Sequence, residues 1–385
     1  MPRATTSVLL CLFFIIYSLH TPLPLSYSWS VQSHQIITKH APALLPTGWR
    51  EFFQYYDWLL NETAAYPDTY YREMDPNEGY RHYIDLEIWS PVNPWTGTLP
   101  QAVEEFASRM RDAIAAGEWN DMFLYAGRLA HYVADAAQPY HATVYYNPVN
   151  RNGTGLHEVL DASMATYFSE LKIVSPPDVG PFQPIDNITS FVFETAKESH
   201  SFLVTINRTL IDEGLEWSSE LMKIIENRTN TAIVSVARVW YTAIVRSGVV
   251  APQVPEVNQL RIIVENMTFS TSDLSSIRLH VIDSLGVKTY ADVRLTIGAV
   301  NYRGFVANVV PPLGEYVIIL GPGSFTDDLL LTADKTGYHS ATLRLGLTNK
   351  MPSSMYLMVP FTTLVAIVMI LGTLVVLVWY RRFTR

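Results

Sequence analysis

The pattern of apolar and polar positions changes once along the chain, at the proline-containing stretch Val249–Val257. Before this stretch, apolar residues recur at the spacing of helices that bury one face. The pattern predicts helices at Gly48–Leu60, Pro100–Ala116, Asp121–Gln138, Thr189–Asp212 and Leu215–Gly248. The strand–helix alternation that builds a parallel sheet is missing. We therefore expect a mainly helical domain over residues 29–250.

After the proline-containing stretch, short runs rich in β-branched residues alternate with turn signals. The runs are Leu260–Val264, Ile277–Ile282, Asp292–Ile297 and Tyr316–Leu320. This spacing predicts a small β-sandwich over residues 251–349, similar to immunoglobulin-like or carboxypeptidase-regulatory-like modules.

Two further apolar stretches lie near the ends of the chain. Residues 1–28 contain a basic start at Arg3, the apolar run Val8–Tyr17 and small residues around the end, which is typical of a secretory signal peptide. Residues 355–380 are apolar and uncharged, and basic residues follow at 381–385. This pattern predicts a transmembrane helix with a short cytoplasmic tail.

These end segments predict a cell-membrane protein that crosses the bilayer once, with both domains outside the cell. Sequons for N-glycosylation agree with that location, at Asn61, Asn152, Asn187, Asn207, Asn227 and Asn266. The single cysteine, Cys11, lies within the predicted signal peptide. The mature chain would then contain no disulfide, so its stability must come from its core and from bound metal.

Candidate chemistry is concentrated in the stretch Gly127–His141. His131 and Asp135 are four residues apart, so a helix places both on one face. Pro139 ends that helix and can turn His141 towards the same cavity. A histidine and an aspartate among apolar residues must be hydrogen bonded to each other or bound to a metal. This stretch alone leaves both alternatives open.

The same pairing recurs at His157 and Asp161, again four residues apart. Upstream, Asp68 and His82 could be brought together as ligands by a loop. Asp85 could hold a ligating histidine in one tautomer, or could be a solvated loop charge.

The predicted cleavage site also bears on metal binding. Cleavage after residue 28 would make Trp29 the N-terminus, and its amine and carbonyl oxygen could then chelate a metal. His34 follows five residues later. The alternatives are that Trp29 is an ordinary aromatic residue and His34 a surface histidine.

Taken in order, the candidate ligands are Trp29, His34, Asp68, His82, His131, Asp135, His141, His157 and Asp161. This series resembles the zinc-dependent phospholipase C and single-strand nuclease superfamily, over about 130 residues. The resemblance implies three zinc ions per chain. One would be bound by Asp68, His82, His131 and Asp135, and a second by His141, His157 and Asp161. The third would be bound by Trp29, His34 and a bridging Asp135.

The resemblance also implies hydrolysis of phosphodiesters by metal-activated water, with Asp68 and Asp135 as catalytic residues. Features of both branches are present. The interval from Trp29 to His34 and the aspartate at 161 are nuclease-like, whereas the short interval from His141 to His157 is phospholipase-like. Nuclease relatives usually contain disulfides, which the mature chain would lack.

Charge favours the phospholipase branch. Residues 29–254 contain 27 Asp and Glu against 15 Lys and Arg, a net charge of −12, which disfavours long polyanions. We therefore expect a phospholipase C acting on phospholipid at a membrane surface, with single-stranded nucleic acid as the alternative substrate. A different alternative is a catalytically silent, membrane-anchored binding module. The sequence indicates no protein partner.

Overall fold

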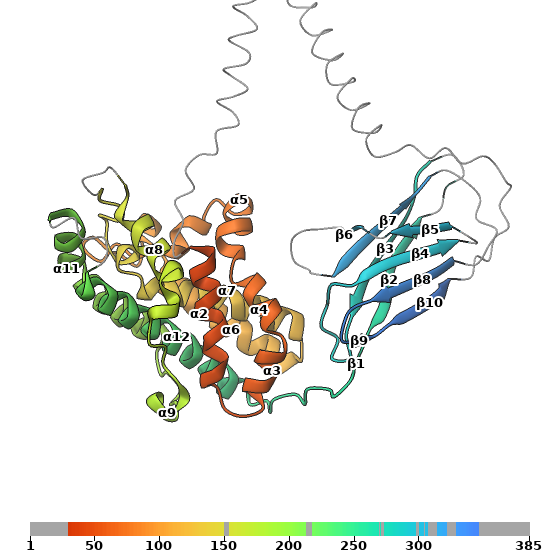
Figure 1. Ribbon diagram of the computed structural model, residues 1–385, viewed down its shortest axis with the longest axis horizontal. Coiled ribbons are helices and arrows are strands. Elements are labelled where there is room, and N and C mark those ends of the chain that lie inside the picture. Colours follow the sequence, from red (N-terminus) through yellow and green to blue (C-terminus); the bar gives the residue numbers. More distant parts are fainter. Residues whose placement is uncertain are drawn as a thin grey trace, which may run out of the picture. The chain divides into compact units, whose positions relative to one another are not determined.

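The computed structural model describes residues 30–149, 154–212, 218–268, 270, 273–297, 300–303, 305–306, 314–321 and 329–345. The chain divides into two compact units, Met1–Val254 and Pro255–Arg385 (Figure 1). The first is mainly helical and the second is rich in β-strands, as the sequence predicts. The predicted signal peptide, transmembrane helix and basic tail lie outside the described residues.

The first unit is built from helices of very different length. They are α2 (Val31–His40), α3 (Trp49–Tyr55), α4 (Asp57–Thr63), α5 (Arg72–Met74), α6 (Leu99–Ala116), α7 (Trp119–Ala137), α8 (Leu156–Thr166), α9 (Pro176–Val179), α10 (Ile188–Ser201), α11 (Leu203–Asn207) and α12 (Ser219–Ser247). Short turns lie between them: η1 (Ala41–Leu44), η2 (Pro67–Tyr71), η3 (Glu78–His82), η4 (Pro94–Thr96), η5 (Pro139–Ala142), η6 (Phe168–Glu170) and η7 (Arg208–Asp212).

Helix α7 is the centre of this unit, and it packs against α4, α6 and α12 (Figure 1). Its approach to α4 requires Gly127, because a Cβ atom there would lie 2.0 Å from the Thr63 hydroxyl. The buried rings of Phe53, Phe123 and Trp240 pack beside this contact. The core therefore fixes α7, which carries the central candidate residues.

Two predicted helices are shorter than the sequence pattern suggests. The expected helix Gly48–Leu60 is divided into α3 and α4 at Tyr56, which has a non-helical backbone (φ −109°, ψ 28°). The Tyr56 ring is fully buried against Phe123, and the bend turns it inwards. The expected helix Thr189–Asp212 is likewise divided, into α10, α11 and η7.

The described residues of the second unit form two four-stranded sheets. One has the order β2 (Arg261–Thr268), β3 (Ser275–Ile282), β7 (Glu315–Leu320) and β6 (Phe305–Val306). The other has the order β10 (Ala341–Leu345), β8 (Leu329–Asp334), β4 (Asp292–Ile297) and β5 (Val300–Arg303). A short parallel pair joins β1 (Asn258–Gln259) to β9 (Tyr338–His339). Inward residues of both sheets, such as Leu279 and Leu331, share one core, which is the arrangement of a sandwich.

The expected single-pass membrane localisation is contradicted by the structure. Within the described residues, no helix combines the length and the apolar character needed to cross a membrane. The longest of them, α12, has 29 residues, but charged side chains such as Lys223 and Glu226 interrupt it and most of its apolar residues are buried. The stretch 355–380 that prompted the expectation lies outside the described residues.

Candidate metal centre

Six elements bring five histidines and three aspartates to one region of the helical unit. The residues are His34 on α2, Asp68 on η2, His82 on η3, His131 and Asp135 on α7, His141 on η5, and His157 and Asp161 on α8. Each of them is at most 6% exposed. These are all the expected ligands except Trp29, which lies outside the described residues.

Local sequence explains how these side chains reach the same region. His131 and Asp135 lie one turn apart on α7, as their spacing predicts. Gln138 precedes a proline and is extended (φ −89°, ψ 120°), so the helix ends and η5 turns His141 back. The Gln138 side chain accepts a hydrogen bond from the backbone N–H of Tyr140, which fixes this turn.

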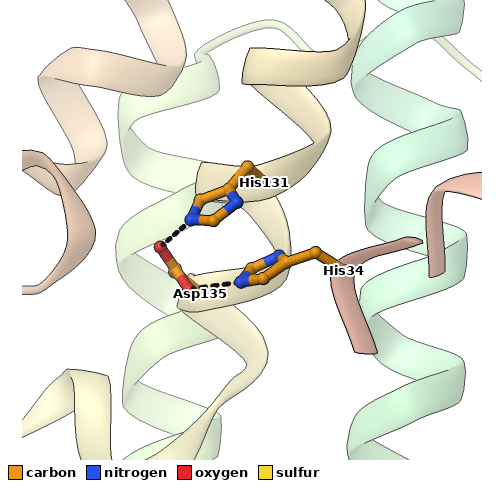
Figure 2. A group of neighbouring side chains, drawn as sticks. All are labelled: His34, His131 and Asp135. Carbon is orange, nitrogen blue, oxygen red and sulfur yellow. Dashed lines mark ion pairs between the residues drawn. The ribbon is translucent and has the colours of Figure 1, made fainter. Parts of the chain in front are cut away.

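Asp135 lies between two sets of histidines. Its Oδ1 atom lies 3.4 Å from His34 Nε2, and its Oδ2 atom lies 3.0 Å from His82 Nδ1 and 3.6 Å from His131 Nε2. Figure 2 shows the His34 and His131 rings stacked on each other, both directed at Asp135; their centroids are 3.5 Å apart and their planes differ by 12°. One carboxylate thus faces histidines from three elements, the arrangement expected of a bridging ligand.

Asp68 completes this group from the side of η2. Its carboxylate oxygens lie 3.7 Å from His82 Nδ1 and 3.7 Å from His131 Nε2. The ligand atoms form two overlapping sets, each within 4.8 Å: His34, His131 and Asp135, and Asp68, His82 and His131. The residues expected at the first zinc ion are therefore brought together.

A second group is formed by His141, His157 and Asp161. The Nε2 atoms of the two histidines are 2.9 Å apart, and His157 Nε2 lies 3.4 Å from Asp161 Oδ2. Gln138 donates a hydrogen bond to the other oxygen of Asp161, Oδ1, at 2.8 Å. Asp161 is thereby oriented so that Oδ2 faces the histidines.

Hydrogen bonds to backbone carbonyls fix the tautomers of two histidines. His131 Nδ1 donates to the carbonyl oxygen of Ala64 at 2.8 Å, and His141 Nδ1 donates to that of His82. A carbonyl oxygen only accepts, so each proton is on Nδ1 and the lone pair on Nε2 faces the other ligands. Both rings are held in the form that binds a metal.

The electrostatics of the cluster favour bound cations. Burial lowers the pKa of His131 to about 3 and that of His141 to about 4, and it lowers the pKa values of His34, His82 and His157 well below the usual value. The imidazoles are therefore neutral at neutral pH, as metal ligands must be. Burial also raises the pKa values of Asp135 and Asp161 well above the usual value, and the nearby charge of Asp68 acts in the same direction on both.

Unsatisfied oxygens give a direct test of whether a metal fits. Within the described part of the chain, Asp135 Oδ1 and Asp161 Oδ2 are buried and accept no hydrogen bond. Buried carboxylate oxygens normally have partners, and a divalent cation would supply them. Imidazole and carboxylate donors without thiolate suit zinc. The residues present therefore fit the metal that the sequence resemblance implies.

The remaining expected residue, Asp85, does not reach the histidines. Its carboxylate makes no hydrogen bond to any histidine of the described chain, and its backbone N–H donates to the Thr96 carbonyl at 2.9 Å. Burial, followed by the nearby Glu87, raises the pKa of Asp85 to about 6. Asp85 lines the neighbouring cavity instead.

Three residues of the site were not predicted from the sequence. Glu78 lies behind His82, Arg72 Nε lies 3.0 Å from Asp68 Oδ1, and Gln138 holds Asp161. Both Glu78 and Arg72 are four residues from a ligand, so the spacing used to pair His131 with Asp135 could have found them. No spacing pattern in the sequence indicates Gln138, because its partner, Asp161, is 23 residues away.

A cavity of about 420 Å³ opens beside the cluster. Its lining is formed by Arg72, Gly79, Tyr80, His82, Tyr83, Asp85, Tyr140, His141, Val144, Tyr146 and His157. Ligand histidines from both groups thus border a space that a small molecule could enter. Burial, followed by the charge of Asp85, raises the pKa of Tyr83 to about 12, so its phenol stays neutral.

Comparison with known proteins found similarity only among solved structures. No family model matches the chain, and no curated protein matches it. Alpha-toxin of Clostridium perfringens, from avian strain SWCP, is 11% identical with a TM-score of 0.42, covering 84% of this chain and 93% of the toxin. Alpha toxin of Clostridium absonum is 12% identical with a TM-score of 0.40, covering 86% and 97%. Both structures are distant from this chain in sequence and in TM-score, and neither decides its fold or its activity.

Proposed function

We propose that this protein is a zinc-dependent phosphodiester hydrolase, and specifically a phospholipase C that cleaves the head-group phosphodiester of phospholipids. The observation that carries the proposal is the convergence of buried histidines and aspartates beside an open cavity. A site that only stabilises a fold is usually closed and binds a single metal ion. Two ligand groups at the wall of a cavity favour catalysis over a silent binding module.

We propose three zinc ions, held as the sequence resemblance implies. The first set is Asp68, His82, His131 and Asp135; the second is His141, His157 and Asp161; the third is Trp29, His34 and Asp135. Zinc supplies, when bound, positive charge that polarises a phosphodiester and lowers the pKa of water.

The chain's own residues then orient the reactants. Arg72 lines the cavity and holds Asp68 through its Nε atom. Its guanidinium group has further N–H donors, which can bind a phosphate oxygen. Asp68, held in this orientation, can accept a proton from the attacking water. Asp135 keeps His34, His82 and His131 in position around it.

The aromatic surroundings of the cavity support a lipid substrate. Val144, Tyr146, Tyr80 and Tyr83 line the cavity, and Trp95 packs on Tyr80 with 5.1 Å between ring centroids. Trp95 is 70% exposed and Tyr145 is 74% exposed. Exposed aromatic side chains beside a site suit the interface between lipid and water.

A nuclease is the second candidate, because the same tyrosines could stack on unpaired bases. The net charge of −12 over residues 29–254 counts against it, since nucleic-acid affinity rests largely on neutralising phosphates.

The experiment that separates the two uses the zinc-loaded chain on phosphatidylcholine vesicles and on single-stranded DNA in parallel. We expect phosphorylcholine release from the vesicles, loss of that activity with chelator and its return with zinc. Cleavage of DNA alone would establish the nuclease. No turnover of either substrate by a zinc-loaded, folded chain would refute the phosphodiesterase.

A further inference from the structure

A buried carboxylate lies behind one of the proposed zinc ligands. Glu78 begins η3 and His82 ends it, and both side chains are buried. Glu78 Oε1 lies 3.8 Å from His82 Nε2. This distance is too long for a hydrogen bond, but a charge at this range acts strongly on a ring in a dry interior.

The surroundings of His82 identify its metal-binding nitrogen. Nδ1 faces the other ligand atoms: Asp135 Oδ2 at 3.0 Å, His131 Nε2 at 3.1 Å and Asp68 Oδ1 at 3.7 Å. Nε2 is buried on the opposite side and makes no hydrogen bond within the described chain. A neutral ring that offers the lone pair of Nδ1 must carry its proton on Nε2, and that proton points towards Glu78.

Glu78 is itself held in place by charged and polar neighbours. Its Oε2 atom accepts hydrogen bonds from Arg81 Nη1 at 2.8 Å and Arg128 Nη2 at 2.7 Å, and its Oε1 atom accepts one from the Tyr132 hydroxyl. Arg128 in turn lies over the ring of Tyr71, 3.7 Å from its centroid. The carboxylate therefore has a fixed position, and its negative charge is compensated by arginines on the side away from His82.

We propose that Glu78 is a positioning residue, whose carboxylate keeps the proton of His82 on Nε2 and so keeps Nδ1 available for metal. The inference rests on the proposed zinc function. His131 and His141 meet neutral carbonyl oxygens in the same role, whereas His82 faces a charge. A charged partner raises the basicity of a ligating imidazole more than a neutral one.

The position of Glu78 should affect both ligand groups. The backbone carbonyl of His82 accepts the hydrogen bond from His141 Nδ1, and His141 belongs to the second group. If η3 shifts because Glu78 no longer holds His82, the tautomer of His141 loses its support as well. Removal of one carboxylate should therefore weaken more than one zinc site.

The test compares Glu78→Gln with wild type in the full chain. Zinc affinity of the metal-free protein is measured by competition with a chelator, and the tautomer of His82 in the same metal-free protein is read from its ¹⁵N shifts. We expect the affinity of the weakest site to fall about 10–100-fold, the usual effect of losing an outer partner of a metal ligand. We also expect the His82 Nε2–H signal to lose its single-tautomer character.

The matched control is Arg81→Gln. It removes one partner of Glu78 but leaves the carboxylate beside His82, and Arg81 is partly exposed, so the change is tolerated. If Glu78 only stabilises the fold, both variants melt earlier while zinc affinity and the His82 tautomer stay as in wild type; that result overturns the inference.

Two further outcomes keep the test decisive. If Glu78→Gln does not fold, Glu78→Asp is used, which retracts the charge by one methylene; unchanged zinc affinity in that variant overturns the inference. If wild type itself binds no zinc, the proposed function fails, which is distinct from a wild type that binds zinc and a variant that binds it equally well.

Discussion

At the residue scale, the main feature of the site is a buried negative charge among neutral side chains. Asp135 is fully buried and faces His34, His82 and His131, which are all neutral when buried. A carboxylate in such surroundings is stable only when it is protonated or when cations are near. Zinc binding and the stability of this region should therefore depend on the same atoms.

Asp135→Asn should be the most damaging change of a single ligand. It removes the charge shared by two ligand sets, so we expect zinc content to fall by about two ions and the melting temperature of the zinc-loaded protein to fall with it. Metal analysis and calorimetry measure both effects. Asp121→Asn, a first-turn aspartate at the other end of α7, is the control and should leave both unchanged. Near wild-type zinc content in Asp135→Asn would refute the bridging role.

The metal-free protein should lose stability in acid below about pH 6.5. The pKa of His131 is lowered from 6.5 to about 3 in the folded state, so between these values the unfolded chain binds more protons and stability falls as pH falls. Asp135 and Asp161 act in the opposite direction, because their raised pKa values make the folded state bind more protons above about pH 4. Because the five histidines outnumber the two aspartates, the net effect of lowering the pH is a loss of folding stability.

Melting curves of chelator-treated protein from pH 7 to pH 4 check this sign. His131→Gln removes one of the histidine contributions, so its melting temperature should depend less steeply on pH than that of wild type. An equal slope in both proteins would show that His131 does not titrate as its burial requires.

At the element scale, the sequence predicted what periodicity determines. The helix around His131 and the pairs at 131/135 and 157/161 follow from i, i+4 spacing, and the structure shows them on α7 and α8. The division at Tyr56 was not predictable, because it depends on a ring packing against Phe123, 67 residues later. Glu78 lies four residues before His82, so spacing makes it a candidate, but spacing does not decide between Glu78 and Asp85; the folded chain shows that Glu78 lies behind His82.

Gly127→Ala should move α4 away from α7, and both of these helices position the site. The added methyl group would lie 2.0 Å from the Thr63 hydroxyl and 2.8 Å from the Ala64 nitrogen, so α4 must move away from α7. Overpacking of this kind costs about 1–3 kcal/mol of folding stability. Because the Ala64 carbonyl holds His131, zinc affinity should fall too. Denaturant unfolding and zinc titration measure the two effects, and full zinc affinity in a destabilised variant would contradict the link.

The exposed aromatic residues next to the cavity lining should matter for aggregated substrate only. Trp95→Ala should weaken turnover on phospholipid vesicles about 10-fold, because burying a large apolar side chain is worth about 1.5–3 kcal/mol. Turnover of a short-chain, water-soluble phospholipid should change little. Val250→Ser is the control, since Val250 is 87% exposed, whereas Trp95 packs on Tyr80 of the cavity lining. Equal loss on both substrates would mean that Trp95 shapes the site itself.

At the scale of the whole molecule, the ligands come from residues 34 to 161 and from six elements, so the cluster exists only once the helical unit has folded. Metal binding and folding of this unit should therefore be coupled. The N-terminal side of the cluster starts at the beginning of α2, where Ser30 accepts a hydrogen bond from the Ser33 N–H at 3.2 Å and His34 follows within a turn. The proposed ligand Trp29 directly precedes this cap in the sequence.

The mature N-terminus should therefore decide whether the third zinc ion binds. When Trp29 is preceded by another residue, its nitrogen belongs to a peptide bond whose lone pair is delocalised, and it cannot chelate. When Trp29 is first, the same nitrogen is a basic amine beside its own carbonyl oxygen. A chain starting at Trp29 should thus bind about three zinc ions, and one with a single glycine before Trp29 about two, with most activity lost.

The glycine extension leaves Trp29 and every other ligand in the sequence, so the variant isolates the amine. Zinc content by metal analysis is the deciding measurement, because it does not depend on any substrate. Trp29→Phe at the first position is the matched control: it keeps the amine and the carbonyl oxygen and should keep the third ion, since the chelate uses backbone atoms alone. An extended chain with unchanged zinc content would remove Trp29 from the site and leave His34 and Asp135 to bind that ion without it.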